Sequence, residues 1–475
     1  MKPDLVWIKC RSDGAGHRLF DTVRGVRNSL RTSSPDAQDT VSQFGYVSSF
    51  NNNGFTLTPG TYSGYESGDV NMSGRTYVGW SWKAGGNKNT FNIDDVGYAN
   101  ASDVNMNVGG LNSSVYDQSQ NWTNNVSSTS NITSGHEARL FNGVLSGSGA
   151  DIQSSQGTSG VINFTSAITG SKIEIYTIGN VGQIGINGSN LSVTANQWVD
   201  TGVTSLTSVE TRHPGAGSIQ NPTGLKVDGK ILVDSGLSVT TVPTVANTGC
   251  SVGTKQGFSI VAYNATGSNL TVNHGLSKRP GLIILKSKNV SGDWLVWHQS
   301  LSGVDRFVKF NDNMAQAQAS NVFLSVDEHT FGTGNDAGIN SSNQQKIAYI
   351  WHDVPGLQKF GTYEGNTTQG EFVELGFRPA LIWLKSIDQS WYWNIHDSKR
   401  SPINPSLGNF LRPDSNAGDG STSGHNNIDF LSNGFKIRST TSNSEPTNVN
   451  GQTYIYCAWA EAPAVNLYGG QSNAR

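Results

Sequence analysis

Three stretches with one pattern decide the fold of this chain: PDLVWIK at residues 3–9, PGLIILK at 280–286 and PALIWLK at 379–385. Each has a proline, a small or polar residue, four apolar residues and a lysine. Proline is accepted at the first position of a strand, and a run of four apolar residues has the length of a buried strand. Each stretch therefore predicts a buried β-strand near the start of a repeated unit.

Further elements recur in the same order within each copy. FNNNGFTL (residues 50–57) and FLSNGFKI (430–437) place an Asn-Gly turn between two strands, and the middle copy has the divergent form VDEHTF (326–331). A repeat of roughly 100 residues with several short strands has the size of a β-sandwich, so we expect each copy to form a separate sandwich. The copies end on strands of alternating aromatic residues, at positions 77–82, 349–351 and 454–459.

The stretch from about residue 86 to residue 250 does not match the repeat. It is dense in Gly, Ser and Asn and contains alternating runs such as VINF (residues 161–164) and KIEIY (172–176). Alternation with period two produces strands with one buried face. This stretch therefore predicts an additional β-sandwich inserted between the first and second copies.

The predicted fold class is all-β, with tandem antiparallel β-sandwich repeats and one inserted, jelly-roll-like β-sandwich. The expected layout is repeat one at 1–86, a linker at 87–119, the insert at 120–236, a linker at 237–255, repeat two at 256–354, repeat three at 355–466 and a flexible C-terminal tail at 467–475.

Composition excludes several classes of protein. Only 14% of the 475 residues are charged, against about 25% in a typical soluble domain, and Gly is abundant with 56 residues. Such a chain is no helical bundle, coiled coil or Rossmann-type enzyme core. The 12 Trp, 14 Tyr and 18 Phe require burial and argue against disorder. A net charge of −3 argues against nucleic acid as the main partner.

The cysteines and the hydrophobic runs restrict the compartment. Cys10, Cys250 and Cys457 are odd in number, far apart and outside any CxxC spacing, so we expect buried free thiols and assembly in a reducing cytoplasm. The first residues lack the apolar core of a signal peptide. The longest apolar runs have strand length, so no membrane insertion is expected.

Several motifs resemble a known family. PDLVWIK, HRLFDTVRG (residues 17–25), YVGWSWKAGG (77–86), GFSIVAYNATG (257–267) and FGTYEGN (360–366) resemble a repeated β-domain in tail-fibre-like virion proteins of marine bacteriophages, of the cyanophage and pelagiphage type. The resemblance covers about residues 3–86 and 250–463. It implies a virion protein that is assembled in the host cytoplasm and exposed on the particle surface. It supplies no catalytic residues.

The insert resembles jelly-roll modules of the same phage proteins, through HEARLFNG (residues 136–143) and LKVDGKILV (225–233). Such modules are loosely similar to carbohydrate-binding sandwiches. Trp122 and Trp198 lie in segments rich in Asn, Thr and Gln, where exposed rings stack on sugars and amides satisfy hydroxyls. Arg212 and His213 follow in a loop suited to an anion. The alternative is that each tryptophan covers an end of the sandwich and that the loop only faces solvent.

The first repeat suggests a docking surface for other virion proteins. Arg11, Arg18, Arg24 and Arg27 belong to the densest basic stretch of the chain, whose alternative role is a solvated face. Copies two and three are each preceded by a hairpin that copy one lacks, so copy one should begin with an open sheet edge. Open edges are usually covered or paired, and a partner chain supplying a strand would make the N-terminal repeat the docking end.

Residues suited to catalysis or metal binding are sparse. His396, Asp397 and Ser398 are strand neighbours that point to opposite faces, which disfavours a triad. Glu364, Glu371 and Glu374 are better explained as solvated charges at a sheet edge. The loop at residues 414–420 spaces three oxygen ligands as Ca²⁺ prefers, but Asp, Asn and Gly also make plain turns. We therefore expect no catalytic residues, no metal and no cofactor.

Three functional hypotheses remain open. The first is a non-enzymatic structural and adhesive virion protein, a tail fibre or appendage that contacts host surface glycan and forms a homo-oligomer, with a trimer favoured by axial symmetry. The second is a capsid decoration or vertex protein. The third is a depolymerase of host polysaccharide, which requires two carboxylates about 5–9 Å apart in an acidic cleft.

Overall fold

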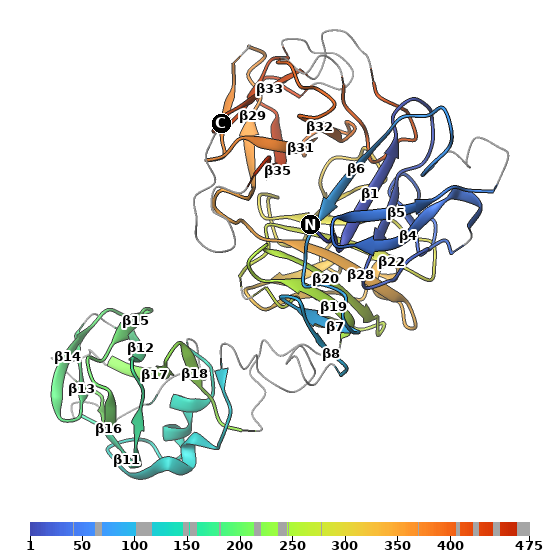
Figure 1. The fold of residues 1–475 in the computed structure, drawn as a ribbon. Helices are drawn as coiled ribbons and strands as arrows, with labels where there is room; N and C mark the ends of the chain where they lie inside the picture. Colours follow the sequence, from blue (N-terminus) through green and yellow to red (C-terminus); the bar gives the residue numbers. More distant parts are fainter. Residues whose placement is uncertain are drawn as a thin grey trace. The chain divides into compact units, whose positions relative to one another are not determined.

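A computed structural model shows an all-β protein of two compact units. Unit 1 comprises Met1–Asn107 and Pro243–Arg475, and unit 2 comprises Val108–Val242 (Figure 1). The β-strands pair antiparallel apart from the pairs β9–β18 and β7–β19, which confirms the predicted fold class. The structure describes residues 1–40, 42–61, 69–100, 116–145, 152, 159–179, 182–212, 220–235, 245, 247–276, 278–368, 370–404, 409–420, 427–439 and 447–462.

Each copy of the repeat in unit 1 has two layers, a main sheet and a smaller outer sheet. The outer layer contains the predicted Asn-Gly hairpin or its divergent form, which confirms that part of the pattern. In copy one the main sheet has the order β3 (Leu30–Arg31), β2 (Arg18–Asp21), β1 (Leu5–Cys10), β6 (Tyr77–Trp82), and the outer hairpin is β4 (Tyr46–Asn51) and β5 (Gly54–Thr58).

Copy two has the largest sheet. Its order is β25 (Ala317–Gln318), β24 (Arg306–Lys309), β23 (Leu295–His298), β22 (Leu282–Ser287), β28 (Gln345–Trp351), β20 (Phe258–Asn264), β19 (Asn247–Gly253), β7 (Phe91–Ile93), β8 (Val96–Tyr98). The outer layer is β21 (Leu270–Asn273), β27 (Thr330–Thr333) and β26 (Phe323–Val326), and the short helix α1 (Ala337–Asn340) precedes β28. No helix among the described residues is long and apolar enough to cross a membrane.

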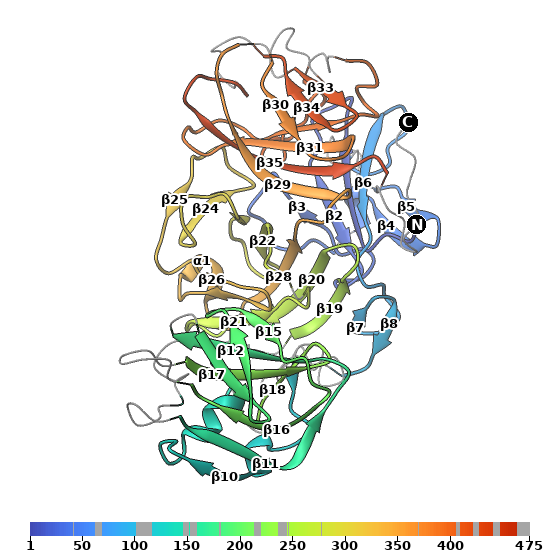
Figure 2. The same ribbon diagram turned by 90° about the vertical axis from the view of Figure 1, so that its left-hand side faces the viewer.

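Copy three repeats this arrangement. Figure 2 shows its outer strands β30, β33 and β34 on one side of β31 and β35. The main sheet has the order β29 (Gln358–Glu364), β35 (Thr453–Ala460), β31 (Pro379–Ser386), β32 (Asn394–Asp397), and the outer sheet has the order β30 (Phe372–Glu374), β34 (Gly434–Ile437), β33 (Ile428–Leu431).

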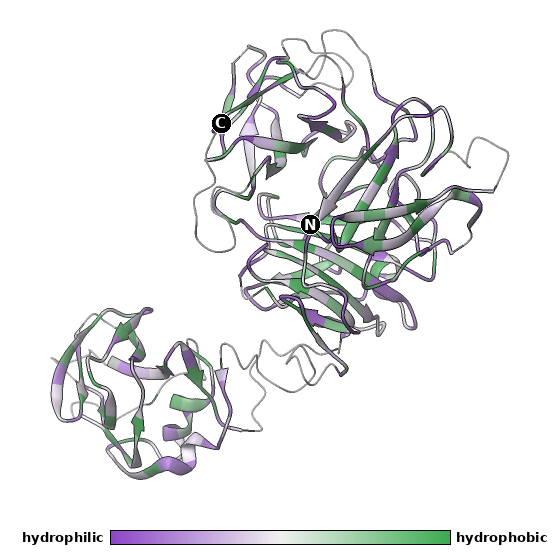
Figure 3. Cartoon of the chain, in the orientation of Figure 1, coloured by the Kyte–Doolittle hydropathy of each residue, from purple (hydrophilic) through white to green (hydrophobic). Residues whose placement is uncertain are grey.

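The apolar run that opens each main sheet is buried on both faces. Successive side chains of a strand point to opposite sides. In β1, Leu5 and Trp7 belong to one large cluster, whereas Val6 and Ile8 pack toward the outer hairpin. The same alternation holds in β22 and β31, and Figure 3 shows hydrophobic residues along these strands. One face of each sheet therefore packs on its own outer layer and leaves the other face for the neighbouring copies.

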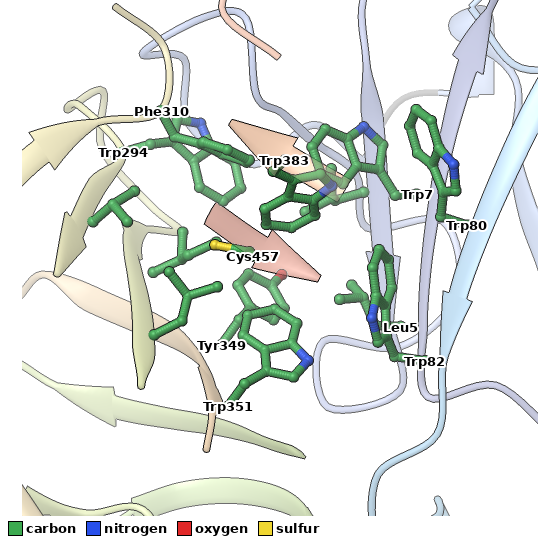
Figure 4. Packing of buried hydrophobic residues seen from close by; sticks show 14 of the residues in the cluster. Leu5, Trp7, Trp80, Trp82, Trp294, Phe310, Tyr349, Trp351, Trp383 and Cys457 are labelled. Carbon is green, nitrogen blue, oxygen red and sulfur yellow. The ribbon is translucent and has the colours of Figure 1, made fainter. Parts of the chain in front are cut away.

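The inner faces of the three main sheets meet in a shared aromatic core. Trp82, Trp351 and Trp459 hold the same position in the three copies, and their ring centroids lie 5.6–6.1 Å apart in edge-on contacts. Trp7 and Trp383 join them at 5.3 Å from one another (Figure 4). Edge-to-face contacts at this spacing are favourable for aromatic rings. The matched tryptophans thus bind the copies to one another.

This shared core corrects two expectations. The copies do not form separate sandwiches, because one face of each main sheet packs against the other two copies. The segments expected to be linkers, 87–119 and 237–255, also contain strands. β7 and β8 form a hairpin that extends the copy-two sheet by parallel pairing with β19. Their sequences are polar, but edge strands need only one apolar face.

Buried lysines connect the copies in a circle. Lys9, Lys286 and Lys385 are the second-to-last residues of β1, β22 and β31 and have at most 1% exposure, and burial lowers the pKa of each ammonium to about 8. Each ammonium donates to a backbone carbonyl of another copy. The lysine of copy one reaches copy three, that of copy two reaches copy one, and that of copy three reaches copy two. The distances are 3.0 Å from Lys9 to Asn416, 2.7 Å from Lys286 to Pro35 and 3.2 Å from Lys385 to Asn313.

A second circle of polar contacts uses the last residue of β2, β23 and β32, the strands that follow β1, β22 and β31. Asp21 accepts a hydrogen bond from Tyr349 Oη at 2.7 Å, and Asp397 accepts one from Trp80 Nε1 at 3.2 Å. In copy two, His298 Nε2 lies 3.2 Å from the Tyr456 carbonyl oxygen. Each copy therefore contacts both others, and unit 1 is a ring of three repeats around one core.

Unit 2 is a sandwich of two five-stranded sheets with its own apolar core. Its described residues include the 3-10 helices η4 (Trp122–Asn125) and η5 (His136–Phe141), and Leu140 and Phe141 of η5 are fully buried. One sheet has the order β10 (Val126–Ser130), β11 (Val161–Thr169), β16 (Ser205–Glu210), β13 (Gly182–Ile186), β14 (Ser189–Val193). The other has the order β15 (Trp198–Asp200), β12 (Ile173–Gly179), β17 (Gln220–Val227), β18 (Lys230–Leu232), β9 (Tyr116–Asp117).

Candidate functional site

An aromatic pair lies on the outer face of the second sheet of unit 2. Along β12, Ile173 and Ile175 point into the core, so Glu174 and Tyr176 lie on the opposite, half-exposed face. β15 pairs with β12 and places Trp198 opposite Tyr176. The two rings meet edge to face with centroids 5.3 Å apart. The sequence pattern of two strands therefore builds an aromatic surface on a face turned away from the core.

Charged groups surround these rings. Lys226 Nζ lies 4.1 Å from the centroid of the Trp198 ring and 3.9 Å from a carboxylate oxygen of Glu174. Glu174 also accepts from Lys172 at 2.9 Å. A cation above an indole face is attracted by the negative charge of the ring, worth about 0.5–1 kcal/mol at an exposed site. The arrangement orients Lys226 and Glu174 beside the aromatic pair.

The apolar side of the surface comes from β9 and β18. Trp198 packs with Tyr116, Ile231 and Val233. Below the ring, β17 carries Gly224, where an added Cβ would lie only 3.2 Å from the Trp198 ring. The glycine therefore allows the indole to lie close to the sheet. We call the combined patch the Trp198 surface, formed by Tyr116, Glu174, Tyr176, Trp198, Lys226 and Ile231.

Trp122 has a different role. It lies at the start of η4, packs against the apolar core of unit 2 and donates from Nε1 to the Asp117 carbonyl oxygen at 3.0 Å. Next to it, Thr123 donates both its N–H and its hydroxyl to Asp234, which anchors the turn. Trp122 is half-buried, and these contacts fit the alternative in which it covers an end of the sandwich. Among the described contacts its ring does not meet Trp198.

Arg212 does not join the Trp198 surface within the described contacts. Its guanidinium is 29% exposed, lies 2.7 Å from Glu210 and donates to the Gly188 carbonyl oxygen at 3.4 Å. These contacts hold the side chain at the end of β16 and beside the turn between β13 and β14. His213, the fourth candidate for glycan contact, lies outside the described residues.

The basic stretch of copy one is largely an internal network, which corrects the expected docking surface. Arg18 is 1% exposed and lies 2.8 Å from Asp69 and 3.2 Å from Asp39. Arg24 is equally buried and pairs with Asp21 at 2.5 Å. A guanidinium removed from water needs a counter-ion and hydrogen-bond acceptors, so these charges serve folding.

Arg11 and Arg27 complete this picture. Arg11 pairs with Asp419 of copy three at 2.8 Å, which adds another contact between copies. Arg27 lies in the exposed part of the stretch, with its guanidinium carbon 4.7 Å from the centroid of the Tyr46 ring. The four arginines thus do not form one free basic patch.

The loop at residues 414–420 also serves the contact between copies. Asp419 bridges Arg11 and Arg400, the latter at 2.9 Å. Asp414 is half-buried and accepts from the backbone N–H of Trp393, and desolvation raises the pKa of its carboxyl to about 7. No cluster of three or more His, Cys, Asp or Glu suited to a metal occurs in the described parts of the chain.

The three cysteines are free and buried, as predicted. Burial raises the pKa of the Cys250 thiol to about 12. His396 is also fully buried, which lowers its pKa to about 3, and its neighbour Asp397 pairs with Arg400 at 2.5 Å. These groups are therefore held in their neutral or paired forms inside the fold.

Sequence reasoning found Trp198 but missed Tyr176 and Lys226. The signal was present, since the alternation IEIY puts Glu174 and Tyr176 on one face. Which strand lies next to β12 follows only from the tertiary pairing of β15 and β17. The sequence shows the buried lysines as the last residue of the three matching stretches at 3–9, 280–286 and 379–385. It does not show that the carbonyls that accept their hydrogen bonds lie in other copies.

Comparison with known families agrees with the division of the chain. Residues 1–109 and 233–463 match a domain of unknown function, DUF7483. The chain belongs to the DUF7483 family. The matched segments include the three repeats and leave out most of unit 2, so the DUF7483 region is the ring and unit 2 is an insertion into it. Neither the curated proteins nor the solved structures contain a match.

Proposed function

We propose that this DUF7483 protein is a non-enzymatic structural and adhesive protein of a bacteriophage virion, a tail fibre or appendage whose insert binds host surface glycan. The observation that carries the glycan part is the Trp198 surface, because it combines two aromatic rings with an acidic and a basic group on the outer face of unit 2. The virion part rests on the resemblance of the repeat motifs to marine phage proteins.

The chemistry of the Trp198 surface suits a pyranose. The C–H groups of a sugar pack on aromatic rings. Because Lys226 already lies over the Trp198 ring, the sugar is expected to contact the edge of this ring and the Tyr176 ring beside it. Sugar hydroxyls both donate and accept hydrogen bonds, so Glu174 supplies acceptors and Lys226 supplies donors. Lys226 also favours acidic sugars, since its ammonium lies beside the ring. The ligand class is therefore a surface polysaccharide that carries uronic acid or another anionic residue.

The ring of unit 1 fits the role of a scaffold. Its copies are joined by buried tryptophans, by buried lysines and by the ion pair between Arg11 and Asp419, which favour a rigid body. Assembly of several chains, with a trimer favoured, remains part of the proposal. Light scattering of the purified protein determines the mass of the assembly.

A glycan array probed with the whole chain tests the binding function. We expect binding to anionic bacterial polysaccharides, and Trp198→Leu should weaken it at least tenfold because the ring is lost while apolar volume is kept. The matched control is Phe372→Leu, which removes a ring that is 41% exposed in unit 1 and should leave binding unchanged. Equal binding by both variants and the unchanged chain would refute the Trp198 surface as the site.

Two further measurements test the virion assignment and the enzyme alternative. Mass spectrometry of purified particles, with immuno-labelling, should find the chain on the virion and distinguish an appendage from a capsid decoration. Incubation with the polysaccharide that binds should release no fragments. Fragments would assign the protein to the depolymerases instead.

A further inference from the structure

Strand β6 has a free edge where its counterparts in the other copies have a partner. β28 lies between β22 and β20, and β35 lies between β31 and β29. β6 pairs with β1 on one side, and no described strand pairs with it on the other. The Trp82 carbonyl accepts from Asp4 N–H on the β1 side at 2.8 Å. Since backbone groups alternate, Gly79, Ser81 and Lys83 direct theirs to the free edge.

The strand that fills this place in copy three comes from the linker after copy two. β28 ends at Trp351, and β29 begins at Gln358 and pairs with β35 of copy three. The segment after each copy thus completes the sheet of the next copy in the ring. By this rule the residues after Trp459, which ends the aromatic strand of copy three, complete the sheet of copy one.

The sequence after Trp459 repeats the sequence after Trp351. Residues 351–361 read WHDVPGLQKFG and residues 459–469 read WAEAPAVNLYG. Both have a Trp, any residue, an acid, an aliphatic residue, a proline, a small residue, an aliphatic residue, an amide, any residue, an aromatic ring and a glycine. The match pairs Leu357 with Val465 and Phe360 with Tyr468. The tail therefore carries the pattern of β29 itself.

A pocket of about 410 Å³ lies along the free edge of β6. Its walls include residues 79–82 of β6 with Lys83 after it, Ala380 and Leu381 of β31, and Trp459, Ala460 and Glu461, where the chain enters the tail. The lining is largely apolar, with three tryptophans. The place is therefore shaped for an extended apolar segment and adjoins the point from which residues 464–469 depart.

The lining of this pocket matches the surroundings of Phe360. In copy three the Phe360 ring lies 5.7 Å from Trp459 and close to Gly281, and its N–H donates to Asp353 at 2.8 Å. The same positions around β6 are held by Trp82, Ala380 and Glu461, and all three line the pocket. An aromatic residue such as Tyr468 therefore finds a ring, a small residue and a carboxylate. Because a Cβ at Gly281 would lie only 2.8 Å from the Phe360 ring, the Cβ of Ala380 requires the Tyr468 ring to lie slightly farther out than Phe360 does.

We propose that residues 464–469 add to β6 as an antiparallel strand and close the ring of three copies. The register of β29 on β35, in which Phe360 opposes Cys457, places Tyr468 opposite Trp80, Leu467 opposite Ser81 and Asn466 opposite Trp82. The tail then gives copy one the strand that β20 and β29 give the other copies. The edge is filled from within the chain, so no partner chain is needed there. The tail expected to be flexible, residues 467–475, lies outside the described residues, and this proposal assigns its first three residues to the strand.

A cysteine pair tests the register in the whole protein. Ser81→Cys with Leu467→Cys joins directly opposed residues, whose Cα atoms would be about 5.5 Å apart, within the range of a disulfide. The matched control is Ser81→Cys with Tyr468→Cys, whose second side chain points to the other face. Mild oxidation should form an intramolecular disulfide at least tenfold more completely in the first variant, as read by intact mass and thiol counting.

Three outcomes of the cysteine test would overturn the proposal. One is equal crosslinking in both variants. Another is no crosslink in the folded first variant. The third is a disulfide-linked dimer, which would assign the edge to a second copy of the chain.

Hydrogen exchange tests the closing strand without engineered cysteines. In the unchanged protein, the amides of Gly79, Ser81 and Lys83 should exchange at least tenfold more slowly than in a chain that stops after Ala462. The amides of the edge strand β8 serve as the internal control and should not change. Fast exchange of the β6 amides in the unchanged protein refutes the pairing even where the shortened chain does not fold.

Discussion

Raising the pH from 7 to 9 should stabilise unit 1, because its buried lysines lose a charge that the protein interior solvates poorly. Burial lowers the pKa of Lys9, Lys286 and Lys385 from 10.5 to about 8 and that of Lys346 to about 7. The folded pKa is below the unfolded one. Between these values the unfolded chain binds more protons, so the free energy of unfolding rises with pH.

The size of the effect follows from these pKa values. Each lysine with a folded pKa of about 8 contributes about 1.4 kcal/mol between pH 7 and 9, so the three together contribute about 4 kcal/mol. Lys346 adds about 2 kcal/mol. Burial raises the pKa of the Cys250 and Cys457 thiols and of the Asp414 carboxyl, which together subtract about 1 kcal/mol. The net gain is on the order of 5 kcal/mol.

Urea unfolding at pH 7, 8 and 9, followed by tryptophan fluorescence at constant ionic strength, measures this gain. Only Trp122 and Trp198 of the 12 tryptophans lie in unit 2, so the signal reports mainly on the ring. Lys385→Met should reduce the gain by about 1.4 kcal/mol, whereas Lys399→Met, at a side chain that is 82% exposed, should not. A flat or falling stability between pH 7 and 9 would refute the assignment of charged, desolvated lysines.

Three further perturbations probe the ring. Burial lowers the pKa of His274 and His298 to about 4 and that of His396 to about 3, so the unfolded chain binds more protons below pH 6.5. The urea midpoint should therefore fall as the pH is lowered toward 4.5. Asp414, whose pKa burial raises to about 7, acts in the opposite direction and offsets the effect of one histidine. Trp82→Ala should cost about 3–5 kcal/mol in urea unfolding, whereas exposed Phe372→Ala should change stability by about 0.5 kcal/mol or less. Arg400→Met leaves Asp397 buried without its counter-ion and should cost about 3–5 kcal/mol by calorimetry, and an unchanged melting temperature would contradict the buried pair.

The candidate site was only partly predictable from the sequence. Trp198 was identified from its polar neighbours, but the same reasoning applied equally to Trp122, which is partly buried against the core of unit 2. The basic stretch of copy one suggested a docking surface, yet Arg18 and Arg24 are buried in ion pairs. Charge counts cannot distinguish a free arginine from a paired one, because the acidic partner can lie far away in the chain, as Asp69 does.

The sequence by itself determined the strands, because local periodicity encodes which residues are buried. The phrases at residues 3–9, 280–286 and 379–385 predict strands that the structure contains as β1, β22 and β31, and the Asn-Gly turns predict their hairpins. Only the tertiary structure decided what covers the second face of each sheet. A run of apolar residues requires burial on both faces but does not specify the partner, and here the partner is the other two copies.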